Sequence, residues 1–262
     1  MFTRPLLAVL FALTAFPTFA DTGVYQQLLD ASVWIVDPNT GSRGSGVVID
    51  AERGLAVTNY HVVGESRNVA IFFAAFDGEG QLVTNRDTYL DNVDTLMDDG
   101  LACVGRVIGT WEARDLALVE IKTVPTDVTA VPLADTGATP GDAVHSVGNP
   151  GASESLWVYS PGNVRQVYRC QANLDGVQQV DARMLEVTSP INPGDSGSGI
   201  VNSAGELIGI VSNSSRRGRL MSYAIDITEV KAFLQSYGMT PGPSTTTIAG
   251  DFPTTMPVSW PQ

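Results

Sequence analysis

The sequence predicts an all-β protein of sandwich or barrel architecture. Its apolar residues occur in short β-branched runs, and Gly, Pro and Asn separate these runs. Among 262 residues there are 26 Gly and 15 Pro, and only 16% of the residues are charged. A disordered polymer carries more charge, and a long coiled coil is richer in Ala, Glu, Lys and Leu. A strand-and-turn fold is therefore favoured over alternating βαβ units or an unfolded chain.

The predicted strands fall into two sets of similar size. The first set comprises Val33–Val36, Gly46–Ile49, Leu55–Thr58, Val69–Phe76, Ala102–Ile108 and Leu116–Ile121. The second set comprises Ala143–Val147, Leu156–Tyr159, Gly162–Tyr168, Met184–Thr188, Gly199–Val201, Leu207–Ser212 and Leu220–Ala224. Prolines interrupt the strand pattern between residues 124 and 132. We therefore expect two halves, residues 21–125 and residues 126–238.

A helix and a tail follow the last predicted strand. Apolar residues recur at helical spacing at Ile227, Val230, Phe233, Leu234 and Tyr237. Asp226 and Glu229 have the spacing of a capping box, and Gly238 suits the end of a helix. Residues 239–262 are rich in Pro, Thr and Ser without an apolar period, which predicts a disordered tail.

The first twenty residues have the pattern of a signal peptide. Met1–Arg4 is a short positive segment, Leu6–Phe16 is apolar, and Pro17–Ala20 ends in small residues. We expect cleavage after Ala20. The apolar run is short for a membrane span, and no later run reaches about 18 apolar residues. The sequence therefore predicts an exported protein, periplasmic or secreted, without stable membrane insertion once the signal is removed.

The charge balance argues against nucleic acid as a partner. The chain has 28 acidic and 15 basic residues, a net charge of -13, and one close basic group at Arg216, Arg217 and Arg219. An acidic stretch contains Asp87, Asp91, Asp94, Asp98 and Asp99. Its spacing does not fit an EF-hand loop, so we interpret it as a solvated loop between strands. The oligomeric state stays open.

Two cysteines, Cys103 and Cys170, leave two alternatives open. In an oxidising compartment they can form one disulfide, or they can be two separately buried thiols. Neither cysteine has a metal-ligand neighbour two to four residues away, and the chain has only two His. We expect no metal site and no organic cofactor.

The segment Asn192–Gly199 is the strongest candidate for chemistry, because it places Ser196 among residues with little side chain. We expect an oxyanion hole at Gly194, Asp195 and Ser196, because the N–H groups of Gly194 and Ser196 can point into one concavity, as such a hole requires. A plain Gly-rich turn is the alternative interpretation. No Lys follows the glycines, so a phosphate loop is excluded, and Ser196 lacks the Gly two residues later that a nucleophile elbow needs.

A serine nucleophile needs a general base, and the chain offers His61 and His145. His61 follows the apolar run Leu55–Thr58 at its end, whereas His145 lies within a strand pattern and is more simply a packed residue. The base needs a buried carboxylate to fix its tautomer. Asp115, at the start of the run Leu116–Ile121, is the candidate, although such a residue is also a common turn residue.

Together these segments resemble the trypsin-like serine peptidases, most closely the bacterial HtrA/Deg group. The resemblance is carried, in the order of that family, by Gly44–Ile49, Thr58–Val63, Asp115–Leu118, Ser146–Pro150 and Asn192–Gly197. It covers roughly residues 30 to 237. The resemblance implies a fold of two six-stranded antiparallel barrels with a C-terminal helix. It also implies that His61 is the general base, Asp115 its orienting carboxylate and Ser196 the nucleophile.

The chain departs from that family in two respects. HtrA proteins typically have Asn where Asp195 stands, and PDZ domains after the peptidase, whereas we expect no PDZ domain in residues 239–262. Asp195 resembles the aspartate of pancreatic-type enzymes, which pairs with an N-terminus freed by cleavage. The first basic residue after the predicted signal peptide is Arg43, inside the first strand set, so we expect an enzyme that needs no activation.

The substrate pocket is expected to favour small or medium apolar side chains. The resemblance to trypsin-like enzymes implies that Pro190, six residues before the nucleophile, forms the base of the pocket, which then offers no carboxylate to a basic side chain. The expected lining residues are Pro190, Asn192, Ile210, Val211 and Ser212. We therefore expect a serine endopeptidase that acts on polypeptides. The alternative is a non-proteolytic double-barrel module that binds unfolded or partner polypeptides.

Overall fold

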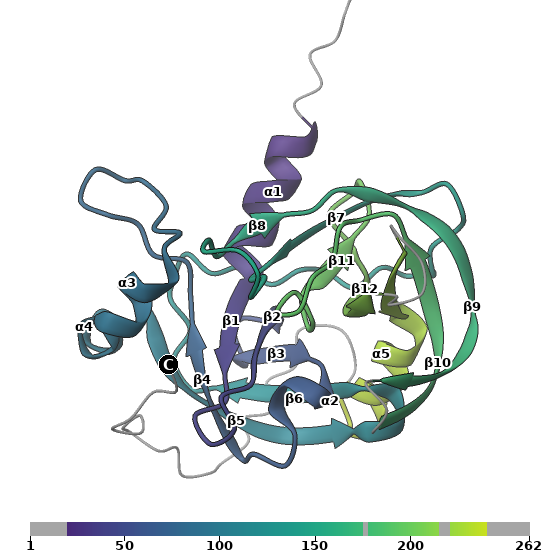
Figure 1. Cartoon of the computed structure of the whole chain (residues 1–262), viewed down its shortest axis with the longest axis horizontal. Helices are drawn as coiled ribbons and strands as arrows, with labels where there is room; N and C mark the ends of the chain where they lie inside the picture. Colours follow the sequence, from purple (N-terminus) through teal and green to yellow (C-terminus); the bar gives the residue numbers. More distant parts are fainter. Residues whose placement is uncertain (1–19, 175–177, 215–220, 240–262) are drawn as a thin grey trace, which may run out of the picture.

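The computed structural model describes residues 20–174, 178–214 and 221–239. Two β-barrels lie against each other, and a helix follows the last strand of the second barrel (Figure 1). The prediction of an all-β double barrel with a C-terminal helix is confirmed. Residues 1–19 of the predicted signal peptide, the basic group at 216–219 and residues 240–262 of the predicted tail lie outside the described residues.

The first barrel is a closed ring of six antiparallel strands in the order β1-β2-β3-β6-β5-β4. Its strands are β1 (Ser32–Val36), β2 (Arg43–Asp50), β3 (Leu55–Thr58), β4 (Asn68–Phe72), β5 (Ala102–Trp111) and β6 (Leu116–Ile121). All residues of β1, β3 and β6 are buried, which accounts for their nearly continuous apolar sequence. Every backbone edge is paired by ring closure.

The second barrel closes through the pairing of β11 with β7. Its strands are β7 (Ala143–Gly148), β9 (Gly162–Leu174), β10 (Gln178–Val187), β11 (Gly199–Val201), β12 (Leu207–Ser214) and β13 (Ser222–Asp226). A further short strand, β8 (Val158–Tyr159), pairs with β7 outside this ring. One buried cluster includes Trp34 and Leu118 of the first barrel and Ile210 and Phe233 of the second half, so the two halves share a core.

Helix α1 (Ala20–Ala31) was not predicted. Its Val24, Leu28 and Leu29 are buried in the cluster that both halves share. The Gln27 amide also donates to the Gly205 carbonyl in the second barrel, at 2.9 Å. The apolar spacing of these residues was an available helix signal.

The interpretation of the acidic stretch as a loop is wrong. It forms two short helices, α3 (Arg86–Asp91) and α4 (Val93–Asp98). The Asn85 side chain caps α3 by accepting from the Thr88 N–H at 3.0 Å, and Tyr89 and Val93 are buried. The five aspartates are exposed, so the expected solvation holds while the expected backbone conformation does not.

Several strand limits also differ from the prediction. β4 ends at Phe72, and Phe76 makes only an isolated bridge with Leu82. The run predicted at Leu156–Tyr159 is reduced to β8, because Trp157 has a left-handed backbone with φ of 61°. His61 lies not on a strand end but on the single turn of α2 (Tyr60–Val63).

The C-terminal helix α5 spans Ile227–Ser236, and its cap differs in detail from the prediction. Asp226 accepts from the Thr228 N–H at 2.8 Å. Glu229 does not complete a capping box. Its carboxylate instead accepts from the Arg183 N–H at 2.8 Å and lies 2.8 Å from the Arg114 Nε atom.

The two cysteines are free thiols. Cys103 lies on β5 beside the core of the first barrel, and Cys170 lies on β9 beside the shared cluster. Burial raises the pKa of the Cys103 thiol to about 12, so it stays protonated at neutral pH. No helix in the described part of the chain is long and apolar enough to cross a membrane. The same residues contain no cluster of three or more metal-ligating side chains.

Candidate active site

His61 is positioned by the junction of β3 with α2. Asn59 is extended, and α2 then turns the backbone so that the His61 N–H donates to Asp115 Oδ1 at 3.1 Å. The ring atom Nδ1 lies 2.9 Å from both Asp115 oxygens. The imidazole is therefore held by its backbone and by its ring, and one third of the side chain stays exposed.

Asp115 is fully buried at the junction of the 3₁₀ turn η1 (Glu112–Arg114) with β6. Its backbone is left-handed, with φ of 53°, a conformation that Asp adopts more readily than most residues. Besides His61, its Oδ2 accepts from the Ser212 hydroxyl at 2.8 Å. The Asn59 amide donates to the Asp115 carbonyl at 2.9 Å. Ser212 thus holds the carboxylate opposite the imidazole, and Asn59 holds the backbone of the same residue.

Ser196 lies in the tight turn between β10 and β11, and two glycines are required there. Gly194 has φ of 102° and Gly197 has φ of 91°, values that side chains disfavour. A Cβ atom at Gly197 would lie 2.0 Å from the Ser45 carbonyl oxygen, across the boundary between the barrels. The Ser45 N–H also donates to the Ser196 carbonyl at 2.7 Å. The turn is therefore docked on β2 of the first barrel.

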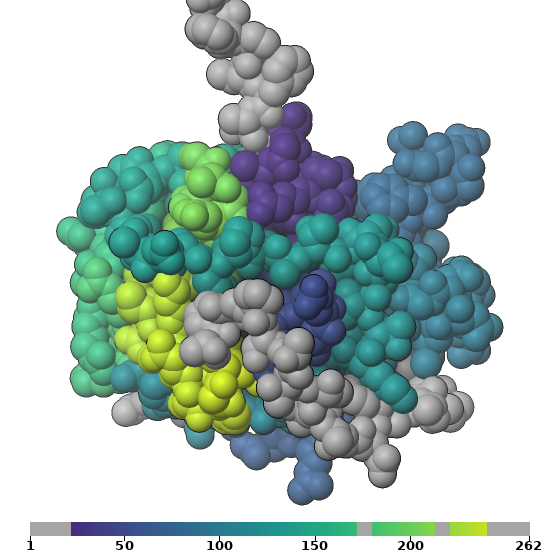
Figure 2. All heavy atoms as spheres, turned by 180° about the vertical axis from the view of Figure 1, so that it is seen from behind, coloured from purple at the N-terminus to yellow at the C-terminus, as the bar shows by residue number. Residues whose placement is uncertain are grey.

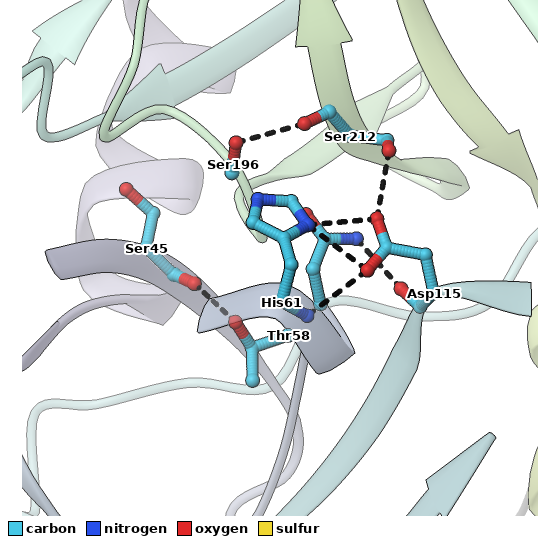
Figure 3. A network of polar contacts seen from close by, with 7 residues as sticks. Ser45, Thr58, His61, Asp115, Ser196 and Ser212 are labelled. Atoms are coloured by element: carbon cyan, nitrogen blue, oxygen red, sulfur yellow. Dashed lines mark hydrogen bonds and ion pairs between the residues drawn. The ribbon is translucent and has the colours of Figure 1, made fainter. Parts of the chain in front are cut away.

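Ser212 connects the nucleophile candidate to the carboxylate. The Ser196 hydroxyl donates to the Ser212 carbonyl at 2.8 Å, while the Ser212 hydroxyl donates to Asp115 (Figure 3). Ser212 lies where the pairing of β12 with β13 shifts register, between Val211 and Asn213, which frees its backbone from the ladder. The structure therefore brings His61, Asp115 and Ser196 into one network, with the Ser196 hydroxyl turned to a backbone carbonyl.

The N–H groups of Gly194 and Ser196 are available for a substrate oxygen. Within the described residues, neither N–H donates a hydrogen bond to the protein. The Pro193 carbonyl accepts from the Gly151 N–H at 2.6 Å, and the Gly194 carbonyl accepts from the Ser45 hydroxyl at 2.9 Å. Asp195 was also expected in the oxyanion hole, but its N–H donates to the Asn192 carbonyl at 3.0 Å and is not available.

Asp195 is buried, and its partner is a backbone group. The Asn192 N–H donates to Asp195 Oδ2 at 2.8 Å, and no cation pairs with this carboxylate in the part of the chain that the structure describes. Gly148 lies against Oδ1, where a Cβ atom would approach to 2.3 Å. Burial, partly opposed by the bond from Asn192, raises the pKa of Asp195 to about 6.

This pKa predicts a stability difference between wild type and Asp195→Asn. The ordinary pKa is 3.8, so the folded state binds the proton more tightly, and this carboxyl favours folding below pH 3.8. The advantage is lost as the pH rises through about 6. The free energy of unfolding of Asp195→Asn, relative to that of wild type, should therefore be about 2 kcal/mol higher at pH 7 than at pH 4. Urea unfolding of both proteins at pH 4 and pH 7 measures these free energies. The prediction is contradicted if the difference between variant and wild type is the same at both pH values.

The residues expected to line the substrate pocket differ in burial. Pro190 and Asn192 are exposed, as a lining requires. Ile210 and Val211 are fully buried in two different apolar clusters, because successive side chains of β12 point to opposite faces. Ser212 is also fully buried and bonds Asp115. Ile210 and Val211 are therefore packing residues, and their assignment to the pocket is corrected.

His145 is a packed strand residue, as its position within the predicted run indicated. It is 6% exposed on β7, and its Nδ1 atom lies 2.6 Å from the Tyr159 hydroxyl. Its ring stacks on that of Tyr159. Ser45 and Asn149 are supporting residues that the analysis of individual side chains missed. The Ser45 hydroxyl joins the Asn149 N–H to the Gly194 carbonyl. Both residues lie within segments that carried the family resemblance.

A hydroxyl beside a histidine–carboxylate pair, with two unused backbone donors in the same turn, defines the serine hydrolase class of site. Because this site lies on a double β-barrel, the class of serine hydrolase is that of the trypsin-like enzymes. The trypsin-like peptidase domain family matches residues 44–210, more than half of the chain. The chain belongs to this family.

Curated relatives include bacterial endoproteases. The chain is 31% identical over 169 residues to the periplasmic serine endoprotease DegP of Salmonella typhimurium. It is 29% identical over 169 residues to the periplasmic pH-dependent serine endoprotease DegQ of Escherichia coli. Each match covers 64% of this chain but only 29% of DegP and 30% of DegQ. The chain therefore corresponds to less than a third of those relatives.

Solved structures of proteases share the fold. The active form of the Rv3671c protease from M. tuberculosis matches with a TM-score of 0.63 and 19% identity, covering 94% of this chain and 98% of that one. The serine endoprotease from Yersinia pestis matches with a TM-score of 0.59 and 20% identity, covering 84% of this chain and 67% of that one. At these identities the likeness supports the double barrel alone.

Proposed function

We propose that the protein is an exported serine endopeptidase that cleaves polypeptides through an acyl-enzyme on Ser196. The observation that carries this proposal is the network of His61, Asp115 and Ser196 beside the unused N–H groups of Gly194 and Ser196. The named relatives are endoproteases, which supports a polypeptide substrate. The signal-peptide pattern and the periplasmic relatives support export to the periplasm or beyond.

The proposed reaction begins with rotation of the Ser196 hydroxyl from the Ser212 carbonyl toward His61 Nε2. Oγ then attacks the peptide carbonyl carbon while Nε2 takes the hydroxyl proton, and Asp115 stabilises the imidazolium that forms. The carbonyl oxygen becomes an oxyanion that accepts from the Gly194 and Ser196 N–H groups. The imidazolium gives its proton to the leaving amine as the C–N bond breaks. Water then releases the acid by the same steps and restores Ser196.

Labelling and substrate profiling test this proposal. A fluorophosphonate should attach to one residue, and peptide mapping should place it on Ser196, because only an activated serine displaces fluoride rapidly. A peptide library with internal cleavage sites should then be hydrolysed within the chain of each peptide. Failure to label, combined with measurable binding of unfolded polypeptides, would instead support the non-proteolytic binding module. Hydrolysis of esters but not of peptides would contradict the endopeptidase assignment.

We expect a chain that begins at Asp21 to react with the fluorophosphonate immediately, without proteolytic activation. Residues 21–42 contain no Lys or Arg, and strand β1 within them is wholly buried and paired with both β2 and β4. A cut there would remove structure from the barrel. The Asp195 carboxylate also already accepts a hydrogen bond from the Asn192 N–H, so it does not need a new N-terminus as a partner. Mass spectrometry of labelled protein decides the matter, and label found only on molecules truncated between residues 22 and 46 contradicts the expectation.

A further inference from the structure

The strands β4 and β5 are joined by a large insert, residues 73–101. Neighbouring antiparallel strands can be joined by two residues, so this length is not required by the barrel. The insert contains the bridge between Phe76 and Leu82 and the helices α3 and α4. It projects from the side of the first barrel (Figure 1) and forms the blue protrusion at the right edge of the view from behind (Figure 2). We call it the β4–β5 insert.

The β4–β5 insert pairs with the loop that leads from β7 to β8 in the second barrel. The Leu156 N–H donates to the Thr84 carbonyl at 2.8 Å, and Asn85 and Ser155 form an antiparallel bridge. On the side chain of Arg86, Nη2 donates to the Pro150 carbonyl at 2.8 Å, and the guanidinium lies 5.8 Å from the centre of the Trp34 ring. The Arg86 N–H also donates to the Glu154 carbonyl at 3.4 Å, so the insert holds this loop at residue 150 and at residues 154–156.

Tyr89 of α3 makes a third connection, and all of its hydrogen-bonding capacity is used. Its hydroxyl accepts from the Ala75 N–H at 2.8 Å and from Trp157 Nε1 at 2.9 Å, and it donates to the Val83 carbonyl at 3.1 Å. The Trp157 N–H in turn donates to the Asn149 side chain at 3.0 Å. The left-handed backbone of Trp157 is thus held from the insert on one side and from Asn149 on the other.

The same loop sets the orientation of the peptide between Pro193 and Gly194. The Gly151 N–H, one residue after Pro150, donates to the Pro193 carbonyl at 2.6 Å. In a trans peptide the C=O and N–H groups point in opposite directions. The bond from Gly151 therefore aims the Gly194 N–H at the place where the oxyanion would develop. Close packing assists, since a Cβ atom at Gly194 would lie 2.5 Å from the Asn149 carbonyl oxygen.

We propose that the β4–β5 insert positions the oxyanion-binding peptide of this chain, and that Arg86 is the positioning residue through which it acts. The contacts run from Arg86 to Pro150, then through Gly151 to Pro193 and Gly194. The Pro150 carbonyl also accepts from the Ser153 N–H of its own loop at 3.2 Å, so the Arg86 bond is the one that ties this carbonyl to the insert. Without the Arg86 bond, residues 150 and 151 are no longer anchored to the first barrel at this point, and the peptide after Pro193 can turn. The affinity for the substrate would then be unchanged, but the oxyanion of the transition state would lose the Gly194 N–H as a hydrogen-bond donor. This inference rests on the proposed function, because it assigns a role to the same N–H group.

Arg86→Met tests the proposal, because it keeps a side chain of similar reach over Trp34 and removes the guanidinium. We expect kcat for a peptide substrate to fall about 10- to 100-fold with KM within about 2-fold, since complete loss of one oxyanion donor costs about 100- to 1,000-fold. A peptide aldehyde, which forms an oxyanion adduct with Ser196, should bind more weakly by the same factor as kcat. The matching peptide alcohol should bind unchanged. Arg86→Lys, which keeps a donor, should recover most of the activity.

The matched control is Arg53→Met, which removes an arginine of the same barrel whose nearest ion pair is with Asp50, at 3.9 Å. It should leave kcat and both affinities unchanged. Tyr89→Phe removes all three hydrogen bonds of the Tyr89 hydroxyl, to Ala75, Trp157 and Val83, at nearly constant volume. It should give the Arg86→Met pattern with a smaller change in kcat, so it serves as the second test if Arg86→Met does not fold.

A folded Arg86→Met with kcat within 2-fold of wild type overturns the inference, as does an equal loss of aldehyde and alcohol binding. If Arg86→Met does not fold, a Tyr89→Phe variant with wild-type kcat and aldehyde affinity overturns it instead. Wild type that neither labels nor hydrolyses peptides overturns the proposed function and this inference together. If wild type is active and the variants behave like wild type, only the inference about the insert fails and the proposed function stands.

Discussion

Ser196→Ala should lower the turnover of a peptide substrate by about a million-fold, because removal of the nucleophile leaves only binding and oxyanion stabilisation. The fold should be unaffected. The Ser196 side chain makes one hydrogen bond, to the Ser212 carbonyl, and the residue is 8% exposed, so its loss changes little core volume. Turnover is measured with a fluorogenic peptide, and the fold is checked by circular dichroism and the thermal midpoint.

The matched control for Ser196→Ala is Ser198→Ala. Ser198 is two residues away and fully buried, and its hydroxyl lies 3.1 Å from that of Ser146 rather than in the network of His61. This variant should lose some stability and keep its turnover per folded molecule. If Ser196→Ala retains more than a few per cent of wild-type activity, Ser196 is not the nucleophile, whatever the control shows.

Asp115→Asn should lower kcat by about 10,000-fold, the second largest expected effect. The Asp115 carboxylate faces three donors: the His61 N–H, its ring Nδ1 and the Ser212 hydroxyl. An amide offers one oxygen and places an N–H₂ group opposite one of these donors. The imidazole is then driven to the tautomer whose Nε2 carries the proton and cannot accept from Ser196. Single-turnover acylation by an activated ester measures the loss directly.

Asp37→Asn controls for the removal of a buried carboxylate from the same barrel. Asp37 is 1% exposed and accepts from Asn39, Thr40 and Ser66, without contact to His61. We expect it to destabilise the fold while leaving kcat unchanged. Equal kcat losses in the two variants would show that the Asp115 effect comes from general loss of structure and not from the tautomer of His61.

The strands whose residues are all buried could be predicted from the sequence. The predicted runs at β3, β6 and β11 coincide with the observed strands at both ends, since each is largely apolar, fully buried and bounded by turn residues. Helix α1 was missed because it directly follows the predicted signal peptide, and α3 because its acidic residues outweighed the buried Tyr89. In both cases tertiary packing of a few apolar side chains decides the structure, and local composition does not show it.

The candidate site was predictable as a set of residues but not as a geometry. His61, Asp115 and Ser196 were identified by type and order, and the structure brings them into one network. The roles of neighbours were not predictable, because Ser212 reaches Asp115 only through the register shift of β12, and Ile210 turns inward by the strand alternation. Such details depend on pairing partners far away in the sequence.

The division of the network between the two barrels has a consequence for the maturation of the protein. His61 and Asp115 are synthesised early in the chain, whereas Ser196 and Ser212 come from the second barrel, and the Ser45 N–H joins the halves at the Ser196 carbonyl. In the proposed export and catalysis, the hydrolytic centre forms only after residues up to at least 212 have emerged, folded and docked. A nascent first half is therefore harmless to its neighbours, and separately produced halves would be inert until they associate.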